Sequence, residues 1–191
     1  MFLGIADEEF IRGDVPMTKR EIRILTLAEA RIAPADVIWD IGAGTGSMSV
    51  EAARLASEGW VYAVERNAEG AALIRQNAEK FGIKNLTVVE REAPEGLDAL
   101  PACDAAIIGG SGSRLAEILD AIAARMKPGG RVVVNCVTMQ TLASALEYLR
   151  RHKGDFAYEA AQVQVNRLRQ VGPYDMAQAL NPIYIIACQR K

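Results

Sequence analysis

Long apolar runs and an excess of charge are two things that this sequence lacks. No stretch approaches the ~18 to 20 consecutive apolar residues that a membrane helix needs, so we expect no membrane partner. The first ten residues do not follow the basic-then-apolar order of a signal peptide. The formal net charge is only −2. Proteins that bind nucleic acid usually carry a basic footprint, and we therefore expect no nucleic-acid partner.

Cysteine and histidine are also scarce. Cys103, Cys136 and Cys188 are the three cysteines, and His152 is the single histidine. The cysteines are widely spaced, which fits neither a disulfide framework nor a metal site. We expect them to be small buried side chains in a protein of the reducing cytoplasm, and we expect no metal. His152 lies among basic residues near a predicted helix end, which favours a solvated position over a general base.

The remaining composition is that of a globular protein. The chain has 191 residues, of which 50% are hydrophobic and 24% are charged. This length is that of one ordinary domain with a sizeable core. We divide it into an N-terminal arm and helix (1–35), an α/β core (36–153) and a C-terminal β-hairpin (154–191).

Apolar strands and amphipathic helices alternate along the core. Strands are predicted over residues 37–41, 61–65, 86–89, 105–108 and 131–136, and helices over 47–57, 68–81, 113–126 and 140–151. A turn is predicted at 127–130. This alternation predicts a doubly wound, mostly parallel sheet with helices on both faces.

The two ends of the chain follow other patterns. Residues 1–15 are expected to form an irregular arm. Thr18 and Glu21 have the spacing of a capping box that starts a helix, and Pro34 and Asp36 are expected to end it. Near the other end, strands over 158–165 and 183–188 have no helix between them. They are predicted to pair as an antiparallel hairpin with residues 169–181 as its loop.

A glycine-rich turn follows the first core strand. Gly42, Gly44 and Gly46 lie between this strand and its helix, where open α/β sheets bind ligands. Glycine permits positive φ and a close approach of the backbone to a ligand. Glu65 ends the next strand about 20 residues on, where an acid can hold ribose hydroxyls. A tight turn without a ligand is the simpler interpretation, but three glycines in five residues cost conformational entropy.

The spacing of the glycines separates two classes of ligand. The turn has Gly-x-Gly-x-Gly spacing, whereas the dinucleotide fingerprint has Gly-x-Gly-x-x-Gly and brings a helix N-terminus to a pyrophosphate. Asp40 precedes the first glycine. An acid there suits a cationic ligand and would repel a pyrophosphate. A nicotinamide-dinucleotide-binding module remains the alternative from another class.

These residues resemble the class I methyltransferases, whose cofactor is S-adenosyl-L-methionine. Asp40 to Gly46 matches their first motif, and Glu65 matches the acid that holds the ribose. Glu92-Ala93-Pro94 lies where they contact adenine, although many of them have Asp in place of Glu92. The resemblance implies a Rossmann-like, seven-stranded sheet with an antiparallel C-terminal hairpin. The cofactor-binding residues that we assign are Thr18, Asp40, Gly42, Ala43, Gly44, Thr45, Gly46, Glu65, Arg66, Glu92, Ala93 and Gly109.

Further segments narrow the resemblance, and they occur in one order along nearly the whole chain. They are Pro16-Met17-Thr18-Lys19-Arg20-Glu21, Trp39 to Ser47, Ile108-Gly109-Gly110-Ser111-Gly112, Asn135-Cys136-Val137-Thr138 and Asn181-Pro182-Ile183-Tyr184. Together they are similar to the decarboxylating (cobalt-)precorrin-6B methyltransferases of cobalamin biosynthesis. Members methylate carbon 15 of a corrinoid precursor and remove the carboxyl of the ring C acetate. The resemblance also implies a homotetramer. A class I enzyme for tRNA adenine or a protein carboxyl group remains an alternative.

The implied substrate is a polycarboxylate tetrapyrrole, which needs positive charge and backbone donors. Lys19, Arg20 and Arg114 are expected in first turns of helices, where the helix dipole disfavours cations, so substrate carboxylates could explain them. Solvated surface positions are the competing explanation. Asn135 and Thr138 follow the fifth core strand as uncharged groups that could orient the macrocycle or the departing carboxylate. Thr138 could equally be a helix cap.

Overall fold

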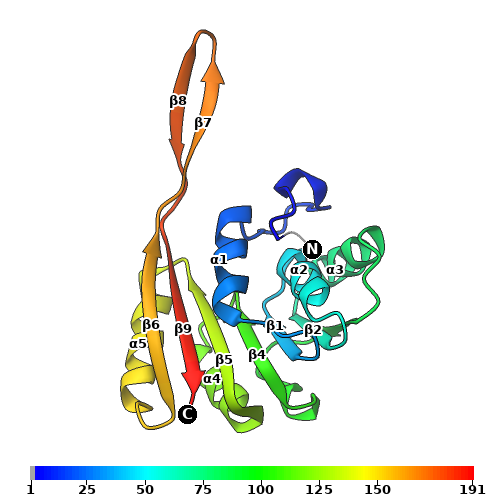
Figure 1. Ribbon diagram of the computed structural model, residues 1–191, viewed down its shortest axis with the longest axis vertical. Helices are drawn as coiled ribbons and strands as arrows, with labels where there is room; N and C mark the ends of the chain where they lie inside the picture. Colours follow the sequence, from blue (N-terminus) through cyan, green and yellow to red (C-terminus); the bar gives the residue numbers. More distant parts are fainter. Residues whose placement is uncertain (1–2) are drawn as a thin grey trace.

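A twisted sheet of seven strands runs through the molecule (Figure 1). The computed structural model describes residues 3–191, so residues 1–2 of the expected arm lie outside the described part. The strand order is β3-β2-β1-β4-β5-β9-β6. The first five of these strands are parallel, and β9 runs antiparallel to both of its neighbours. Their bounds are β1 (Val37–Ile41), β2 (Trp60–Glu65), β3 (Leu86–Glu90), β4 (Cys103–Ile108), β5 (Met126–Cys136), β6 (Phe156–Val163) and β9 (Ile183–Arg190).

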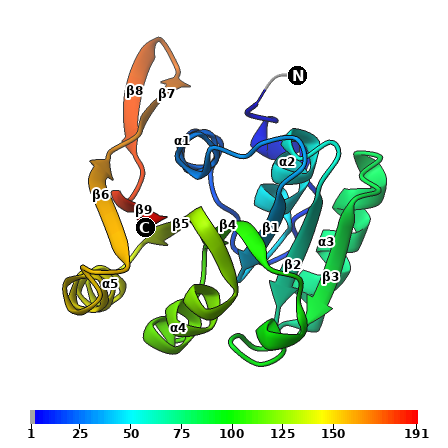
Figure 2. The same cartoon turned by 60° about the horizontal axis from the view of Figure 1, so that its bottom comes forward.

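Helices cover both faces of this sheet (Figure 2). α1 (Arg20–Ala30), α2 (Ser47–Leu55) and α3 (Ala68–Lys80) lie on one face, and α4 (Leu115–Arg125) and α5 (Met139–Arg151) on the other. Alternation along the strands explains the two cores. In β1, Ile38 packs under α1 and α2, whereas Trp39 and Ile41 pack on the α4–α5 side. The predicted fold class, a doubly wound α/β sheet with a C-terminal antiparallel hairpin, is confirmed.

The turn predicted at 127–130 is instead part of β5. Met126 pairs with Cys103 and Arg131 pairs with Ala105, so the register shifts and the extra residues bulge out of the strand. A Cβ on Gly130 would lie 2.8 Å from the carbonyl oxygen of Asp104. Gly130 is therefore needed because two backbone segments approach closely inside a bulged strand. In the sequence, a glycine of this kind looks the same as a glycine in a turn.

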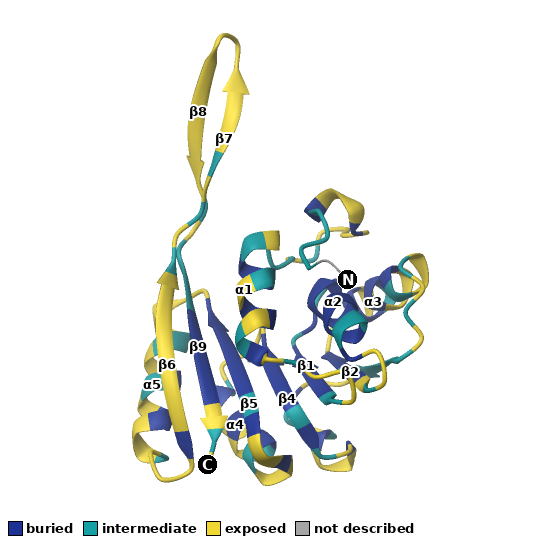
Figure 3. Cartoon of the chain, in the orientation of Figure 1, coloured by how far each residue is buried: buried dark blue, intermediate teal, exposed yellow. Residues whose placement is uncertain are grey.

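The C-terminal hairpin is longer than predicted. β6 and β9 pair antiparallel as expected, but most of the predicted loop forms a second ribbon of β7 (Asn166–Val171) and β8 (Tyr174–Ala179). A two-residue turn joins them, with Gly172 at a φ of 58°. The ribbon projects from the body, and almost all of its residues are exposed (Figure 3). Without a buried face it has no apolar alternation, and for this reason the sequence resembles a loop.

The capping box predicted for α1 does not form. The helix is capped by Lys19 without a side-chain hydrogen bond, because Glu21 turns away to form an ion pair with Arg167 at 2.6 Å. The helix also ends earlier than expected, at Ala30, with Arg31 in the left-handed conformation as its C-cap. A short 3-10 helix, η1 (Asp7–Glu9), lies within the arm that was expected to be irregular.

A buried cation holds this arm against the helices. Arg23 of α1 is fully buried, and its guanidinium lies 2.5 Å from Glu51 of α2 and 3.2 Å from Asp7 of the arm. Arg23 also donates to the backbone carbonyls of Thr18 and Ile5. Asp7 accepts a further ion pair from Arg167 of β7 at 3.0 Å. One network therefore joins the arm, two helices and the projecting ribbon.

Arg23→Ala should destabilise the protein by about 3 to 5 kcal/mol, because it leaves the buried carboxylate of Glu51 without its cation. Chemical denaturation measures the free energy of unfolding. Arg151→Ala is the matched control: its pair with Glu147 is exposed, and its loss should cost no more than about 1 kcal/mol. Equal effects of the two substitutions would contradict a structural role for the buried pair.

Candidate functional site

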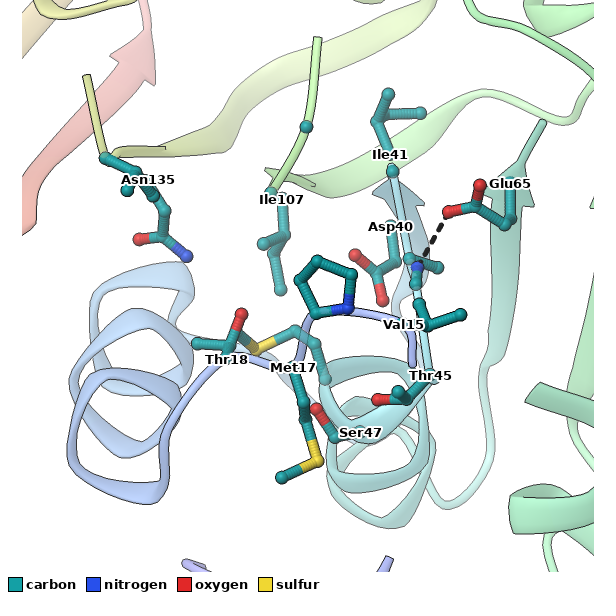
Figure 4. A pocket seen from close by; sticks show the side chains of 18 of the residues that line it. Val15, Met17, Thr18, Asp40, Ile41, Thr45, Ser47, Glu65, Ile107 and Asn135 are labelled. Atoms are coloured by element: carbon teal, nitrogen blue, oxygen red, sulfur yellow. Dashed lines mark hydrogen bonds between the residues drawn. The ribbon is translucent and has the colours of Figure 1, made fainter. Parts of the chain in front are cut away.

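A cavity of about 770 Å³ opens at the carboxyl ends of the parallel strands. The segment 14–19 of the arm forms one wall, and the ends of β1, β2, β4 and β5 form its floor. Val165, Leu180, Asn181 and Ile183, at the base of the projecting ribbon, complete it. Figure 4 shows Glu65 and Asn135 on opposite sides, with Asp40 and Ile107 between them. The strand order therefore arranges the lining residues in a row.

The glycine turn lies at the centre of this row. Gly42, Gly44 and Gly46 have φ values of 70°, 56° and 77°, a region that other residues rarely adopt. A Cβ on Gly42 would lie within 2.6 to 2.8 Å of the backbone of Gly110. Gly42 and Gly44 line the cavity, whereas Gly46 caps α2 and faces Ile74. The turn thus brings bare backbone to the cavity wall.

Glu65 holds this turn in place. Its two carboxylate oxygens accept from the backbone N–H groups of Gly44 and Asn67, each at 2.8 Å. The hydrogen bond from the turn to Glu65 is the dashed line in Figure 4. The residue is 9% exposed and lines the cavity. Each carboxylate oxygen can accept more than one hydrogen bond, so Glu65 can support the turn and still accept from hydroxyl groups of a ligand.

Asp40 is a buried acid beside the same turn. Its carboxylate accepts from the Ser49 hydroxyl at 2.5 Å. Burial, opposed by this hydrogen bond and reinforced by the charge of Glu65, raises the pKa of Asp40 to about 6. A cation in the cavity would relieve both effects. The arrangement therefore favours a positively charged ligand.

A surface ion pair lies beside these acids. Arg66 and Glu92 are 2.7 Å apart, and both side chains are about half exposed. Both residues line the cavity, as does Ala93. An exposed pair of this kind contributes at most about 1 kcal/mol, so either partner can turn toward a ligand at low cost.

Two buried polar groups that line the cavity have no partner within the described residues. They are the hydroxyl of Thr45 and the amide nitrogen of Asn135. Thr45 is 1% exposed and Asn135 is 6% exposed. Buried polar groups are almost always hydrogen-bonded, and exceptions need an explanation. A ligand that fills the cavity would supply the missing partners.

Asn135 is held from behind by α1. Its side-chain oxygen lies 2.9 Å from the hydroxyl of Thr26, which is itself 2.8 Å from the carbonyl oxygen of Ile22. Thr26 is fully buried. This contact joins residues 109 positions apart and holds the side chain of Asn135 between α1 and the cavity. Thr26 was not among the predicted site residues, although a hydroxyl on the apolar face of an amphipathic helix is a signal that could have identified it.

The structure places the three predicted substrate-binding cations in different surroundings. Lys19 lines the cavity, but Arg20 does not. Arg114 is the N-cap of α4 and pairs with Glu95 and Glu117, each at 2.7 Å. These two carboxylates raise the pKa of Arg114. Arg114 is not among the cavity-lining residues, and its carboxylate partners come from its own chain. The helix-dipole argument therefore no longer requires a substrate there.

The remaining predicted residues lie partly in the cavity and partly outside it. Thr138 is the N-cap of α5, where its hydroxyl accepts from the backbone N–H of Thr141, and it does not line the cavity. Thr18, Ala43 and Gly109 line the cavity. His152 stacks on Tyr148, outside the cavity. Within residues 3–191 there is no cluster of side chains that could hold a metal ion, and no helix there is long and apolar enough to span a membrane.

Comparison with known proteins agrees with this geometry. The family model for the precorrin methyltransferase domain matches residues 9–190. The chain is 44% identical over 186 residues to a Pyrobaculum calidifontis protein named "Probable cobalt-precorrin-6B C(15)-methyltransferase (decarboxylating)", covering 96% of this chain and 94% of that one. It is 36% identical to the Salmonella typhimurium protein named cobalt-precorrin-6B C(15)-methyltransferase (decarboxylating), covering 97% and 95%. The structure of precorrin-6y C5,15-methyltransferase from Geobacter metallireducens superposes with a TM-score of 0.92, at 43% identity and with 98% of each chain covered. The chain belongs to the precorrin methyltransferase family.

Proposed function

We propose that this protein methylates carbon 15 of (cobalt-)precorrin-6B and removes the carboxyl of its ring C acetate, with S-adenosyl-L-methionine as the methyl donor. The observation that supports this most directly is the row of groups in the cavity. Two acids stand beside a glycine turn at one end, and an unpartnered amide stands at the other. The relatives named for this reaction match along nearly the whole chain.

The residues present fit the cofactor. Gly42 and Gly44 line the cavity without side chains, so their backbone can approach a bound molecule closely. The buried hydroxyl of Thr45 lacks a partner and can bind the polar amino-acid tail. Asp40 can face the ammonium group, and Glu65 can accept from the ribose hydroxyls. When bound, the cofactor supplies an electrophilic methyl group on a sulfonium. Arg66, Glu92 and Ala93 would border the adenine.

The protein's part in methyl transfer is alignment and exclusion of water. The bridge carbon of the substrate is electron-rich and needs no base to attack a sulfonium methyl group. His152 stacks on the ring of Tyr148 and contacts its backbone carbonyl. It does not line the cavity. Lys19 at the cavity wall can attract a substrate carboxylate as a point charge. Holding the reacting atoms in line supplies the rate enhancement.

We also propose a cytoplasmic homotetramer. The exposed ribbon carries Leu168, Val171, Tyr174 and Met176 at 48 to 75% exposure, and apolar side chains gathered on one projecting element mark an association surface. The three cysteines are free and buried, as in a protein of a reducing compartment. Light scattering after size-exclusion chromatography measures the oligomeric state.

Incubation of the purified protein with (cobalt-)precorrin-6B and S-adenosyl-L-methionine tests the function. Mass spectrometry should show a product that has gained a methyl group and lost carbon dioxide. Omitting the methyl donor controls for spontaneous loss of the carboxyl. An unchanged tetrapyrrole, with cofactor binding intact, would contradict the proposal.

Glu65→Ala should weaken the binding of S-adenosylhomocysteine by about 1.5 to 3 kcal/mol, because hydrogen bonds to a charged group are lost and the turn loses its support at Gly44. Titration calorimetry gives the affinity. Glu58→Ala, at an exposed position in the loop before β2, is a matched control that should bind normally. Unchanged affinity in Glu65→Ala would remove this residue from the site.

Cofactor affinity should fall with decreasing pH as Asp40 takes up a proton. The pKa of Asp40 is raised to about 6, and the ammonium group of the ligand interacts favourably only with the ionised form. Affinity should therefore be full above pH 7 and about tenfold lower at pH 5. Asp40→Asn should bind weakly at every pH and lose this dependence. A wild-type affinity that does not change between pH 7 and pH 5 would contradict the role of Asp40.

Lys19→Ala should raise the KM for the tetrapyrrole about threefold to tenfold at low salt and leave cofactor affinity nearly unchanged. The difference should shrink as salt rises, because charges in contact with solvent are screened over ~10 Å at 0.1 M ionic strength. Arg20→Ala removes the adjacent cation, which does not line the cavity, and should behave like wild type. Equal effects of both variants would indicate general attraction rather than a contact by Lys19.

A further inference from the structure

Residues 12–17 of the arm, which we call the strap, lie against the cofactor end of the cavity. The strap runs between η1 and α1, and four of its residues line the cavity: Asp14, Val15, Pro16 and Met17. The carbonyl oxygen of Pro16 lies 3.1 Å from the position of a Cβ built on Gly44. Figure 4 shows Val15 in the same cavity as Asp40. The strap is therefore the wall next to the glycine turn.

A buried amide fixes the start of the strap. Asn77 of α3 is fully buried, and its side-chain oxygen accepts from the backbone N–H of Ile11 at 2.8 Å. Its side-chain nitrogen donates to the carbonyl oxygens of Ile11, at 2.8 Å, and of Thr45, at 2.9 Å. A backbone N–H only donates and a carbonyl only accepts, so the orientation of this amide is fixed. Asn77 thus ties the residue before the strap to the glycine turn.

A buried guanidinium fixes the other end. Arg23 donates to the carbonyl oxygen of Thr18, the residue after the strap, at 2.7 Å. α1 begins two residues later, at Arg20. Arg23, like Asn77, is fully buried. Movement of either end of the strap would therefore disturb the packing of a helix.

The strap between these two ends is held by packing alone. Within residues 3–191, residues 12–17 take part in no hydrogen bond and no ion pair. Val15 and Met17 are half-buried, and the other four residues are exposed. Gly13 has a φ of 54°, and glycine can leave this conformation without a steric barrier from a Cβ. Segments with few bonds and little burial open at a low cost in free energy.

We infer that the strap is a gate for the cofactor. It moves away from the glycine turn to admit S-adenosyl-L-methionine, closes beside the bound molecule, and opens again to release S-adenosylhomocysteine. The inference rests on the proposed function, because it takes this cofactor as the ligand. Opening breaks no hydrogen bond of the strap, and the two fixed ends return the strap to the same place. Closure brings the apolar side chains of Val15, Pro16 and Met17 to the cavity, which excludes water from the sulfonium.

Limited proteolysis with trypsin tests the movement. The bond between Arg12 and Gly13 lies within the strap, and cleavage there requires the strap to leave the glycine turn. S-Adenosylhomocysteine at about ten times its Kd should slow this cleavage about tenfold, because binding to the closed strap lowers the open fraction by that factor. The bond between Lys153 and Gly154 is the matched control. It also precedes a glycine in an exposed turn, and the ligand should leave its cleavage rate unchanged.

Gly13→Ala tests the hinge of the gate. Alanine is strained at the φ of Gly13, and opening relieves this strain, so S-adenosylhomocysteine should dissociate about fivefold to thirtyfold faster. Stopped-flow displacement measures the dissociation rate. Gly82→Ala is the matched control, because Gly82 has a φ of 66° and open space where a Cβ would lie, and it does not line the cavity. This control carries the same strain and should release the ligand at the wild-type rate.

Two results would overturn the inference. One is cleavage after Arg12 that bound S-adenosylhomocysteine does not slow. The other is a dissociation rate in Gly13→Ala equal to that in Gly82→Ala. Titration calorimetry on the wild-type protein separates these results from a failure of the proposed function. A protein that binds no S-adenosylhomocysteine contradicts the assigned cofactor, whereas a protein that binds it and shows neither effect contradicts the gate alone.

Discussion

The guanidinium of Arg23 is the contact on which the architecture of the site depends. It is buried between Glu51 of α2 and Asp7 of the arm. It also donates hydrogen bonds to the backbone carbonyls of Ile5 and Thr18, which lie on either side of η1 in the chain. The segment 14–19, which walls the cavity, leads directly into α1. A charge buried this deeply is tolerated only with several partners, and Arg23 finds them in the arm and in α2.

The order of the strands in the sheet determines which side chains lie next to one another in the cavity. Parallel strands bring their carboxyl ends to one edge, and the reversal between β1 and β4 opens the cavity there. The acids lie at the ends of β1 and β2, whereas β5 ends in an amide. Two acids and an uncharged amide are thus separated by strand position within one cavity.

Much of this protein could be predicted from local sequence patterns. Contacts between residues far apart in the sequence could not be predicted. Strand and helix alternation, the glycine turn and Glu65 depend on residues near one another in sequence, and the structure places them as predicted. Glu21 has the sequence spacing of a capping residue, but Arg167, 146 positions away, competes for it successfully. Thr26 was not predicted because its partner Asn135 is 109 positions away in the sequence. The ribbon of β7 and β8 was predicted as a loop because it has no buried face.

The position of β9 has a consequence for how the protein is made. β9 lies between β5 and β6 in the sheet, yet it follows β6, β7 and β8 in the chain. Until residues 183–190 emerge from the ribosome, β5 is an open sheet edge with unpaired backbone groups, and β6 has no place in the sheet. Such edges invite pairing with other chains. Nascent chains of this protein are therefore exposed to aggregation until β9 has been made, and a ribosome that stalls before β9 would leave a sheet without the strand that joins β5 to β6.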